Sequence, residues 1–309
     1  MLIGPTDTDR KIRVGFVGFH ALFNPIWNHI TLSLIHRFAL DVSVPGPDGH
    51  LENIPDFLFF SVYGHPHRDP RYDPCVKIFT CEENIRPPWG MCHYAMTGDY
   101  VNNPRHLRLP IYVRMLLHLP YQESIRRLTD PNLSLIKNPS TNWGSLLRSK
   151  TRFCNFVASN PNALRRIKFY ELLSRYKQVD SGGRVGNNVG GPIEDKLTFI
   201  EPYKFTIAFE NRSYPGYVSE KIVEPMVVNS IPIYWGSPRI ADDFDPASFV
   251  VATNRRLEDV VEEVAELDRD DEKYLQKLRH PWFHGNSQNR YCPVDYVANF
   301  LGTVFERER

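Results

Sequence analysis

The first half of the chain sets short apolar runs between turn residues, a pattern that is typical of buried strands. Proline and glycine bound these runs, and their shortness suits strands better than helices. We expect strands at residues 11–20, 56–64, 75–80 and 92–98. Between residues 25 and 37 the apolar residues recur at helical spacing instead, at Ile26, Ile30 and Leu34. The first half therefore predicts an α/β layer design with helices between the strands.

A polar segment at residues 128–150, with Pro131, Pro139 and Gly144, marks the approach to a domain boundary. Strands and helices then alternate in the second half. We expect strands at residues 151–160, 203–209, 231–236 and 248–252, and helices at 161–176, at 217–229 and from Leu257 onward. This order predicts a second doubly wound sheet.

Two of these helices carry apolar stripes that predict core packing. In helix 161–176 the stripe is Leu164, Ile167 and Leu172. In the helix after residue 252 it is Leu257, Val260, Val261, Val264 and Leu267. Stripes of this kind indicate a face buried on a sheet and not a cofactor site.

The composition is that of a globular protein with room for two domains. The 309 residues are 42% hydrophobic and 24% charged, and domains usually hold about 150 residues. The formal net charge is +1. A charge so close to zero gives no indication of nucleic-acid binding or of a basic membrane-binding surface.

The cysteines and the uncharged stretch near the start indicate an intracellular setting. The five cysteines are odd in number and contain no CxxC pair, which argues against a disulfide framework or a zinc ribbon. We expect buried thiols in a reducing compartment. Residues 14–36 carry no formal charge, but His20, His29 and His36 make them a poor membrane span. No signal peptide opens the chain, so we expect a cytoplasmic location, either free or peripheral to the inner membrane.

Three motifs could suggest other chemistry. Gly15 and Gly18 follow the first strand, but their spacing is not the GxGxxG of a dinucleotide site. The histidines of "HPHRD" at 65–69 lie in a loop, where we expect them to be solvated and not metal ligands. The triplet "DFD" at 243–245 resembles an Asp-x-Asp metal site. We interpret Asp245-Pro246 as a turn, with Asp243 as a candidate cap.

The stretch "FENRSYPGYVSEKIVEP" at 209–225 is the main candidate for a ligand-binding motif. Ligands of open α/β sheets bind outside the carboxyl ends of the strands, and this stretch follows a strand. Ser219 is a candidate N-cap, which places Glu220 and Lys221 in the first turn of a helix. Backbone N–H groups and a lysine there favour a phosphate, whereas a carboxylate favours hydroxyl groups. The two together predict a nucleotide sugar.

Two alternatives stay open for this stretch. Glu220 and Lys221 are also what a surface ion pair on a capped helix would look like. Pro225 falls inside the predicted helix, where it removes a backbone hydrogen bond. It could either kink the helix or end its first turn early.

These motifs resemble the signature of the α-1,3/α-1,4-fucosyltransferases of glycosyltransferase family 10, and most closely the soluble bacterial type. The segment "FENRSYPGYVSEKIVEPMVVNSIPIYWGSP" follows the family pattern. "FVASNPNALRRIKFYELL" at 156–173 matches the opening of the family's second domain, with its arginine at Arg166. "FTCEE" at 79–83 and "LRLPIYVR" at 107–114 match the first domain. The resemblance covers most of residues 75–250. Pro225 and Met226 depart from it.

The resemblance implies a GT-B fold, with two Rossmann-like domains that face each other across a cleft. Residues 1–148 would form the N-terminal acceptor-binding domain and residues 149–309 the C-terminal GDP-fucose-binding domain, with the last helix able to pack back on the N-terminal domain. The implied reaction moves L-fucose from GDP-β-L-fucose, with inversion, to a hydroxyl of an oligosaccharide or glycolipid acceptor. The implied acceptor atom is O3 of GlcNAc, as in N-acetyllactosamine. GDP-fucose is then a co-substrate, with no obligatory metal, and no nucleic acid or transmembrane segment is involved.

The resemblance also assigns roles to residues. Glu82 would be the catalytic base. Its neighbour Glu83 would point to the opposite face of the strand. The donor would be bound by Arg166, Asn211, Tyr217, Glu220 and Lys221. From composition alone, and not from the resemblance, Arg184 of the glycine–asparagine loop is a candidate second cation, with a solvated loop arginine as the alternative.

Other functions remain possible on this fold. The chain could be a GT-B transferase that uses a different nucleotide sugar, or a non-catalytic module that binds a nucleotide sugar or glycan. Neither the linkage, α-1,3 or α-1,4, nor the oligomeric state follows from the sequence.

Overall fold

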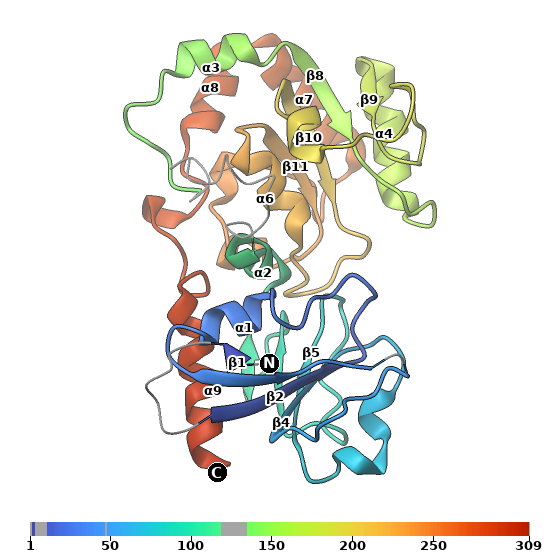
Figure 1. Cartoon of the computed structure of the whole chain (residues 1–309). Coiled ribbons are helices and arrows are strands. Elements are labelled where there is room, and N and C mark those ends of the chain that lie inside the picture. Colours follow the sequence, from blue (N-terminus) through green and yellow to red (C-terminus); the bar gives the residue numbers. More distant parts are fainter. Residues whose placement is uncertain (1, 4–10, 47, 119–134, 309) are drawn as a thin grey trace. The chain divides into compact units, whose positions relative to one another are not determined.

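A computed structural model describes residues 2–3, 11–46, 48–118 and 135–308. The chain divides into two compact units, residues 1–125 with 290–309, and residues 126–289 (Figure 1). We call them the N-terminal unit and the C-terminal unit and describe each by itself. This division begins the second unit at residue 126, where a boundary at 148 was expected, and it groups the last helix with the N-terminal unit, on which that helix was expected to be able to pack.

The N-terminal unit is built on one sheet in the order β1-β3-β2-β4-β5-β6-β7 among the described residues. Its strands are β1 (Leu2–Ile3), β2 (Lys11–Val17), β3 (Ala39–Ser43), β4 (Phe57–Phe60), β5 (Val76–Thr80), β6 (Tyr94–Thr97) and β7 (His106–Arg108). Its helices are α1 (His29–Leu34), α2 (Ile111–His118) and α9 (Val294–Arg307), with the 3-10 turns η1 (Pro66–Arg68) and η2 (Pro70–Tyr72). The sheet is parallel apart from the antiparallel edge pair β1–β3.

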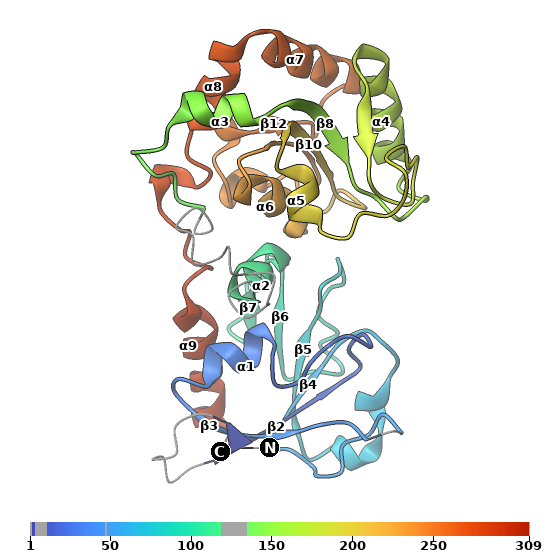
Figure 2. The same cartoon turned by 45° about the horizontal axis from the view of Figure 1, so that its top comes forward.

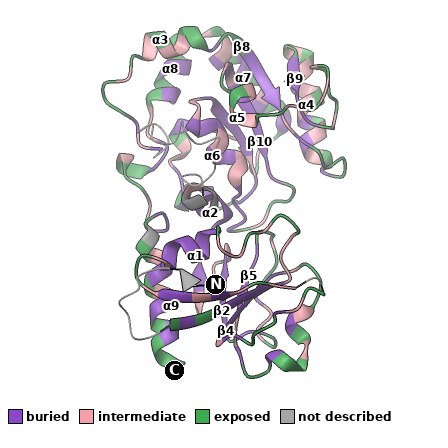
Figure 3. Cartoon of the chain, viewed as in Figure 1, coloured by how far each residue is buried: buried purple, intermediate pink, exposed green. Residues whose placement is uncertain are grey.

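Burial explains why these apolar runs become strands. Strand β4 is buried on both faces (Figure 3), as a parallel sheet covered on both sides requires. The Phe16 ring of β2 stacks on the Phe59 ring of β4, with centroids 5.1 Å apart. The last helix, α9, packs on this unit, where the Phe305 ring lies 4.5 Å from the Phe57 ring between centroids.

The C-terminal unit holds a second sheet, in the order β12-β11-β10-β8-β9, and its described strand pairs are all parallel. Its strands are β8 (Arg152–Phe156), β9 (Val179–Ser181), β10 (Tyr203–Phe209), β11 (Ile231–Trp235) and β12 (Val250–Val251). Its helices are α3 (Trp143–Ser149), α4 (Leu164–Tyr176), α5 (Lys196–Ile200), α6 (Glu220–Val227), α7 (Leu257–Arg269) and α8 (Asp271–Arg279). Helices α4 and α7 pack together on one face, and α5 and α6 on the other (Figure 2). This is the doubly wound sheet that the sequence predicted.

Helix boundaries differ from the prediction where local capping decides them. Helix α1 begins at His29 and not at residue 25, because the Asn24 side chain bonds to two backbone N–H groups in a preceding turn and Asn28 caps the helix. Helix α6 begins at Glu220, because Ser219 is its N-cap. Pro225 does not end this helix, which continues to Val227.

The apolar stripe predicted for helix 161–176 is wrong. Leu164 is 74% exposed, and Ile167 and Leu172 are only half-buried. The helix begins at Leu164 and buries Arg166, Phe169 and Leu173 instead. The stripe of α7 is core as predicted at Leu257, Val260, Val264 and Leu267, whereas Val261 is half-buried.

Candidate functional site

The site of the C-terminal unit begins where strand β10 ends. Glu210 follows Phe209 directly, and its side chain is 0% exposed. Its carboxylate accepts a hydrogen bond from the Ser219 backbone N–H at 2.8 Å, and the Ser219 hydroxyl lies 2.8 and 2.7 Å from its two oxygens. The Ser219 oxygen in turn accepts from the backbone N–H of Lys221, as an N-cap does. Glu210 therefore fixes the start of α6 to the end of β10.

Lys221 lies between two carboxylates in the first turn of α6. Its Nζ is 3.2 Å from Oε2 of Glu210, 3.2 Å from Oε1 of Glu220 and 2.9 Å from Oγ of Ser219. Burial by itself lowers the pKa of Lys221, but the two carboxylates outweigh burial and raise it. Burial raises the pKa of Glu220, but Lys221 and Lys196 outweigh it and the pKa is lowered. Lys221 and Glu220 both stay charged at neutral pH. Because their common neighbour Glu210 is fully buried, Glu220 and Lys221 do not form the surface ion pair that the sequence left open as an alternative.

Arg166 brings a second cation to the same edge from helix α4. Its side chain is buried, and Nη2 donates to Oδ1 of Asn211 at 2.7 Å. Burial lowers the pKa of Arg166, and the charge of Glu210 opposes that effect. An arginine keeps its charge under such conditions, since the guanidinium group is too basic to lose its proton near neutral pH. Its Nε is buried and has no hydrogen-bond partner among the described residues.

Three charged residues of this cluster were not predicted as site residues: Glu210, Lys196 and Glu224. Lys196, on α5, pairs with Glu224 of α6. A small recess of about 10 Å³ is lined by Lys196 and Glu224 together with Arg166 and Lys221. This volume is roughly the space of one water molecule. A signal for Glu210 was present, because it stands in the F-E-N part of the motif. Lys196 had none, since it is brought here only by the packing of α5 against α6.

The structure thus gathers five of the six predicted donor-side residues at the carboxyl edge of β10: Arg166, Asn211, Tyr217, Glu220 and Lys221. Tyr217 is buried, and the negative charge its phenol can carry contributes to the pKa values of Arg166 and Lys221. Arg184, the sixth predicted residue, is not part of this cluster. It is exposed, and it makes no hydrogen bond or ion pair with other residues that the structure describes. Its neighbour Gly183 packs against the Ala158 backbone, beyond the end of β8.

Glu82 lies in the N-terminal unit, at the carboxyl edge of its own sheet. Strand β5 ends at Thr80, so the alternation of faces expected for Glu82 and Glu83 does not apply to them. Both are exposed. Residues 81–83 instead form a tight turn, in which the Cys81 thiol bonds to the Glu83 backbone N–H and carbonyl at 3.2 and 3.1 Å.

Two neighbours distinguish the environment of Glu82. Burial lowers the pKa of Arg114, and Glu82 is the largest influence that opposes this effect. Arg114 is buried and donates from Nη2 to the Met96 carbonyl at 2.9 Å. Burial raises the pKa of Tyr63, and Glu83 and then Glu82 raise it further. Arg114 is thus a buried cation within electrostatic reach of Glu82.

The alternative motifs have structural roles. The predicted turn at Asp245-Pro246 is confirmed, but its cap is Asp245 and not the candidate Asp243, since Asp245 accepts from the Ala247 N–H at 3.0 Å. His67 is buried, contrary to the expectation of solvated histidines, and its ring stacks on Phe60 with centroids 4.1 Å apart. All five cysteines are buried free thiols.

Among the described residues, no three His, Cys, Asp or Glu side chains gather in an arrangement suited to a metal ion. No helix in the described ranges has the length and apolar character to cross a membrane.

Two family models match the chain and together cover both units. "Glycosyltransferase family 10 (fucosyltransferase) C-term" matches residues 147–287, and "Alpha-(1,3)-fucosyltransferase FucT N-terminal domain" matches residues 14–115. The chain belongs to glycosyltransferase family 10. The resemblance seen in the sequence motifs is thereby confirmed.

Curated relatives of this family 10 chain are longer than the chain itself. It is 34% identical over 243 residues to alpha-(1,3)-fucosyltransferase FucT of Helicobacter pylori, which covers 72% of the chain and 50% of that protein. It is 46% identical over 216 residues to alpha-(1,3)-fucosyltransferase B of Drosophila melanogaster, covering 53% of the chain and 48% of that protein. The chain spans about half the length of these two relatives.

Solved structures agree with the fold. A crystal structure of an alpha1,3-fucosyltransferase with GDP-fucose superposes with a TM-score of 0.73 at 26% identity, covering 98% of this chain and 93% of that one. Another alpha1,3-fucosyltransferase structure gives a TM-score of 0.80 at 24% identity, covering 98% and 92%, and shows likeness of fold alone. The family 10 chain therefore has the two-sheet α/β fold of GT-B glycosyltransferases that the sequence predicted.

Proposed function

We propose that this chain is a fucosyltransferase that moves L-fucose from GDP-β-L-fucose to a hydroxyl of an oligosaccharide acceptor. The observation that carries the proposal is the charged cluster at the start of α6, where Lys221 and Arg166 meet at the carboxyl edge of β10. Two fixed cations at a helix N-terminus suit a diphosphate. The relatives named as fucosyltransferases and the structure solved with GDP-fucose support the same donor.

The donor side of the proposed reaction has to stabilise a departing nucleotide. When the bond from the fucose anomeric carbon to the diphosphate oxygen breaks, its electron pair leaves with GDP. Lys221 and Arg166 would neutralise that charge. Glu220 would accept hydrogen bonds from ribose hydroxyls or stabilise the positive charge that develops on the sugar. Asn211, Tyr217 and Arg184 would complete the donor site, Arg184 through its place in the loop beside β8.

The acceptor side needs a group that takes a proton. The acceptor oxygen forms the new bond to the anomeric carbon, and its proton passes to the carboxylate of Glu82. We propose attack from the face opposite the diphosphate, which inverts the anomeric centre. We also propose O3 of GlcNAc in N-acetyllactosamine or a related glycolipid as the acceptor, with residues 1–148 as the acceptor-binding part and 149–309 as the donor-binding part.

The test is a transfer assay with GDP-fucose, with and without N-acetyllactosamine, in which released GDP and fucosylated product are both measured. We expect GDP release that depends on the acceptor, and a product whose linkage NMR assigns. Binding of GDP-fucose without product would indicate a non-catalytic module. Stronger competition by GDP-mannose or UDP-galactose than by GDP would indicate another nucleotide sugar.

We propose that no metal is required, because the two cations occupy the place where a metal would neutralise the diphosphate. Excess EDTA should change the transfer rate by less than about twofold, since no step of the proposed mechanism uses an ion. Loss of nearly all activity, restored by manganese, would contradict this proposal and return attention to Asp243 and Asp245.

A further inference from the structure

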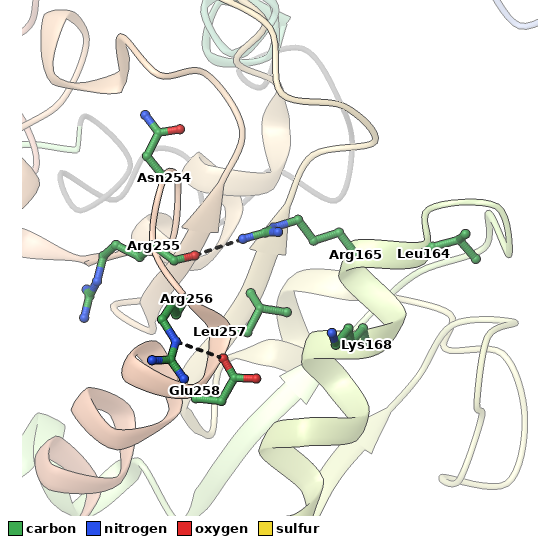
Figure 4. A pocket seen from close by; sticks show the side chains of 8 residues that line it. All are labelled: Leu164, Arg165, Lys168, Asn254, Arg255, Arg256, Leu257 and Glu258. Carbon is green, nitrogen blue, oxygen red and sulfur yellow. Dashed lines mark hydrogen bonds and ion pairs between the residues drawn. The ribbon is translucent and has the colours of Figure 1, made fainter.

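A second charged site lies in the C-terminal unit, where the N-termini of α4 and α7 approach each other. A groove of about 520 Å³ opens there. Arg165 and Lys168 line it from α4, and Arg256, Leu257 and Glu258 line it from the start of α7 (Figure 4). None of the residues that line this groove lines the recess beside Lys221.

Positive charge exceeds negative charge in this groove. Lys168 is exposed and makes no hydrogen bond or ion pair with the described residues. Arg256 has only a loose contact, 3.9 Å from its Nε to Oε2 of Glu258. Arg165, Lys168 and Arg256 thus face the one carboxylate of Glu258, for a net charge of about +2.

Arg165 is held in place, which distinguishes it from an ordinary surface arginine. Its Nη2 donates to the Arg255 carbonyl at 3.0 Å, and its guanidinium lies over the Trp235 ring, 5.4 Å from the centroid. Its Nε is buried without a hydrogen-bond partner among the described residues. The side chain of Arg255 turns away from the groove to Glu263 (Figure 4). Arg165 is therefore held in a fixed orientation before any ligand binds.

The two helix ends contribute little to this positive charge. In the first turn of α4, the N–H groups of Leu164, Arg166 and Ile167 bond to backbone carbonyls. The first turn of α7 holds two carboxylates, Glu258 and Asp259, which offset the positive end of the helix dipole. The three cations, and not the helix ends, therefore carry the positive charge of the groove.

The size of the groove indicates what kind of anion it would take. A volume of about 520 Å³ is within the range of small-molecule sites and far exceeds one phosphate. The bound anion is then one group of a larger ligand. Its recognition does not use the donor cluster, because Arg165 and Arg166, although adjacent in sequence, contact different partners: Arg166 bonds to Asn211 and Arg165 to Arg255.

We propose that this groove binds a phosphate group carried by a ligand other than the sugar donor. Two sources share that chemistry: a glycan acceptor linked through a phosphate or pyrophosphate, and a free pyrophosphate. The first source rests on the proposed function, and the second does not.

Binding of pyrophosphate to the full chain tests the site directly. Calorimetry is done in saturating GDP, so that the donor site is filled. We expect binding that the double variant Lys168→Ala/Arg256→Ala weakens by about tenfold or more, since each lost cation removes a charge-assisted contact. The matched control is Lys177→Ala, at the other end of α4, where the lysine pairs with Asp268. It should bind pyrophosphate as the wild type does.

Transfer assays then distinguish the two sources. For an acceptor linked through pyrophosphate, the double variant should raise KM about tenfold and leave the KM of neutral N-acetyllactosamine unchanged. If the double substitution leaves the KM of both acceptors unchanged while pyrophosphate binding is lost, the site belongs to the free anion. The Arg256 side chain is 77% exposed, so its loss should not unfold the protein, and circular dichroism checks this.

No binding of pyrophosphate by the GDP-saturated wild type would overturn the proposal, as would binding that survives the double substitution. Neither result bears on fucose transfer. Conversely, a wild type without transferase activity that still binds pyrophosphate at Lys168 and Arg256 would leave this site standing and refute the proposed function.

Discussion

The carboxyl edges of the two sheets present their charges in opposite ways. At the edge of β10, Glu210, Ser219 and Lys221 are joined by contacts of 2.7–3.2 Å around a fully buried carboxylate. At the edge of β5, Glu82 is exposed and makes no hydrogen bond or ion pair with the residues the structure describes. One edge is a closed network and the other is an open carboxylate.

This difference corresponds to two different chemical tasks. A leaving diphosphate is stabilised by charges that are already in place, because fixed cations need no reorganisation as the bond breaks. A general base must instead have a lone pair that no neighbour occupies. The nearby guanidinium of Arg114 donates to the Met96 carbonyl and leaves the Glu82 carboxylate open. We therefore expect substitutions at the open edge to affect the rate alone, and those at the closed edge to affect donor binding and stability as well as the rate.

The largest effect should come from the open edge. Glu82→Gln removes the proton acceptor and should lower the transfer rate by about 10²–10⁴-fold. Binding of GDP-fucose should not change, because the base contacts the acceptor. The rate is measured with saturating donor and acceptor.

Glu83→Gln is the matched control for this prediction, since Glu83 is the adjacent exposed carboxylate in the same turn. We expect it to keep activity within about tenfold. An inactive Glu83→Gln would show that the position taken from the F-T-x-E motif is off by one residue. If both variants are active, the base lies elsewhere.

At the closed edge, Glu210→Gln should act mainly on stability. It leaves the partly buried Lys221 without its buried counter-ion, which should cost on the order of 3 kcal/mol of unfolding free energy. Thermal unfolding followed by circular dichroism measures the loss.

The control for Glu210 is Glu272→Gln, which removes a carboxylate that is 79% exposed and 3.5 Å from Arg279. An exposed pair contributes under about 1 kcal/mol, so its Tm should hardly move. Equal effects of the two substitutions would contradict the distinction between a closed network and surface charge.

Lys221→Ala should weaken GDP binding by about 10- to 150-fold, the equivalent of a charge-assisted hydrogen bond of roughly 1.5–3 kcal/mol. Calorimetry with GDP measures this change, and Lys177→Ala serves as a control lysine far along α4. Unchanged affinity in a folded Lys221→Ala protein would remove the lysine from the donor site and leave it a purely structural role.

The smallest expected effect is a loss of stability of the N-terminal unit at acidic pH. Burial lowers the pKa of His67 to about 4, below its ordinary 6.5. The unfolded chain then binds a proton that the folded chain does not, so stability is lost as pH falls from about 6.5 to 4. The loss between pH 7 and pH 5 should be about 2 kcal/mol.

His67→Phe tests this origin, because both ring nitrogens of His67 are buried without hydrogen-bond partners among the described residues. The substitution keeps the stacking on Phe60 and removes the titrating group. Urea unfolding at pH 5 and pH 7 should show a smaller pH dependence than in the wild type. An unchanged dependence would assign the acid sensitivity to other groups.

Much of the fold and part of the site follow from local sequence. Strand β10 was predicted at 203–209 and is Tyr203–Phe209, because a run of apolar residues buried on both faces has few other solutions. Ser219 was predicted as an N-cap from its side chain alone. Short strands such as β3, β7 and β9 were missed, because their few residues show no distinct pattern and sheet pairing holds them in place.

What the sequence determined by itself is the order of strands and helices, the motif at 209–225 and the residue types that suit a nucleotide sugar. Only the tertiary structure decided which charges meet. Lys196 reaches Glu224 because α5 packs on α6, and Arg165 of α4 reaches the ring of Trp235, the last residue of β11. The physical reason is that strand and helix propensity depend on near neighbours in the chain, whereas burial and electrostatic energy depend on distances in space between residues far apart in sequence.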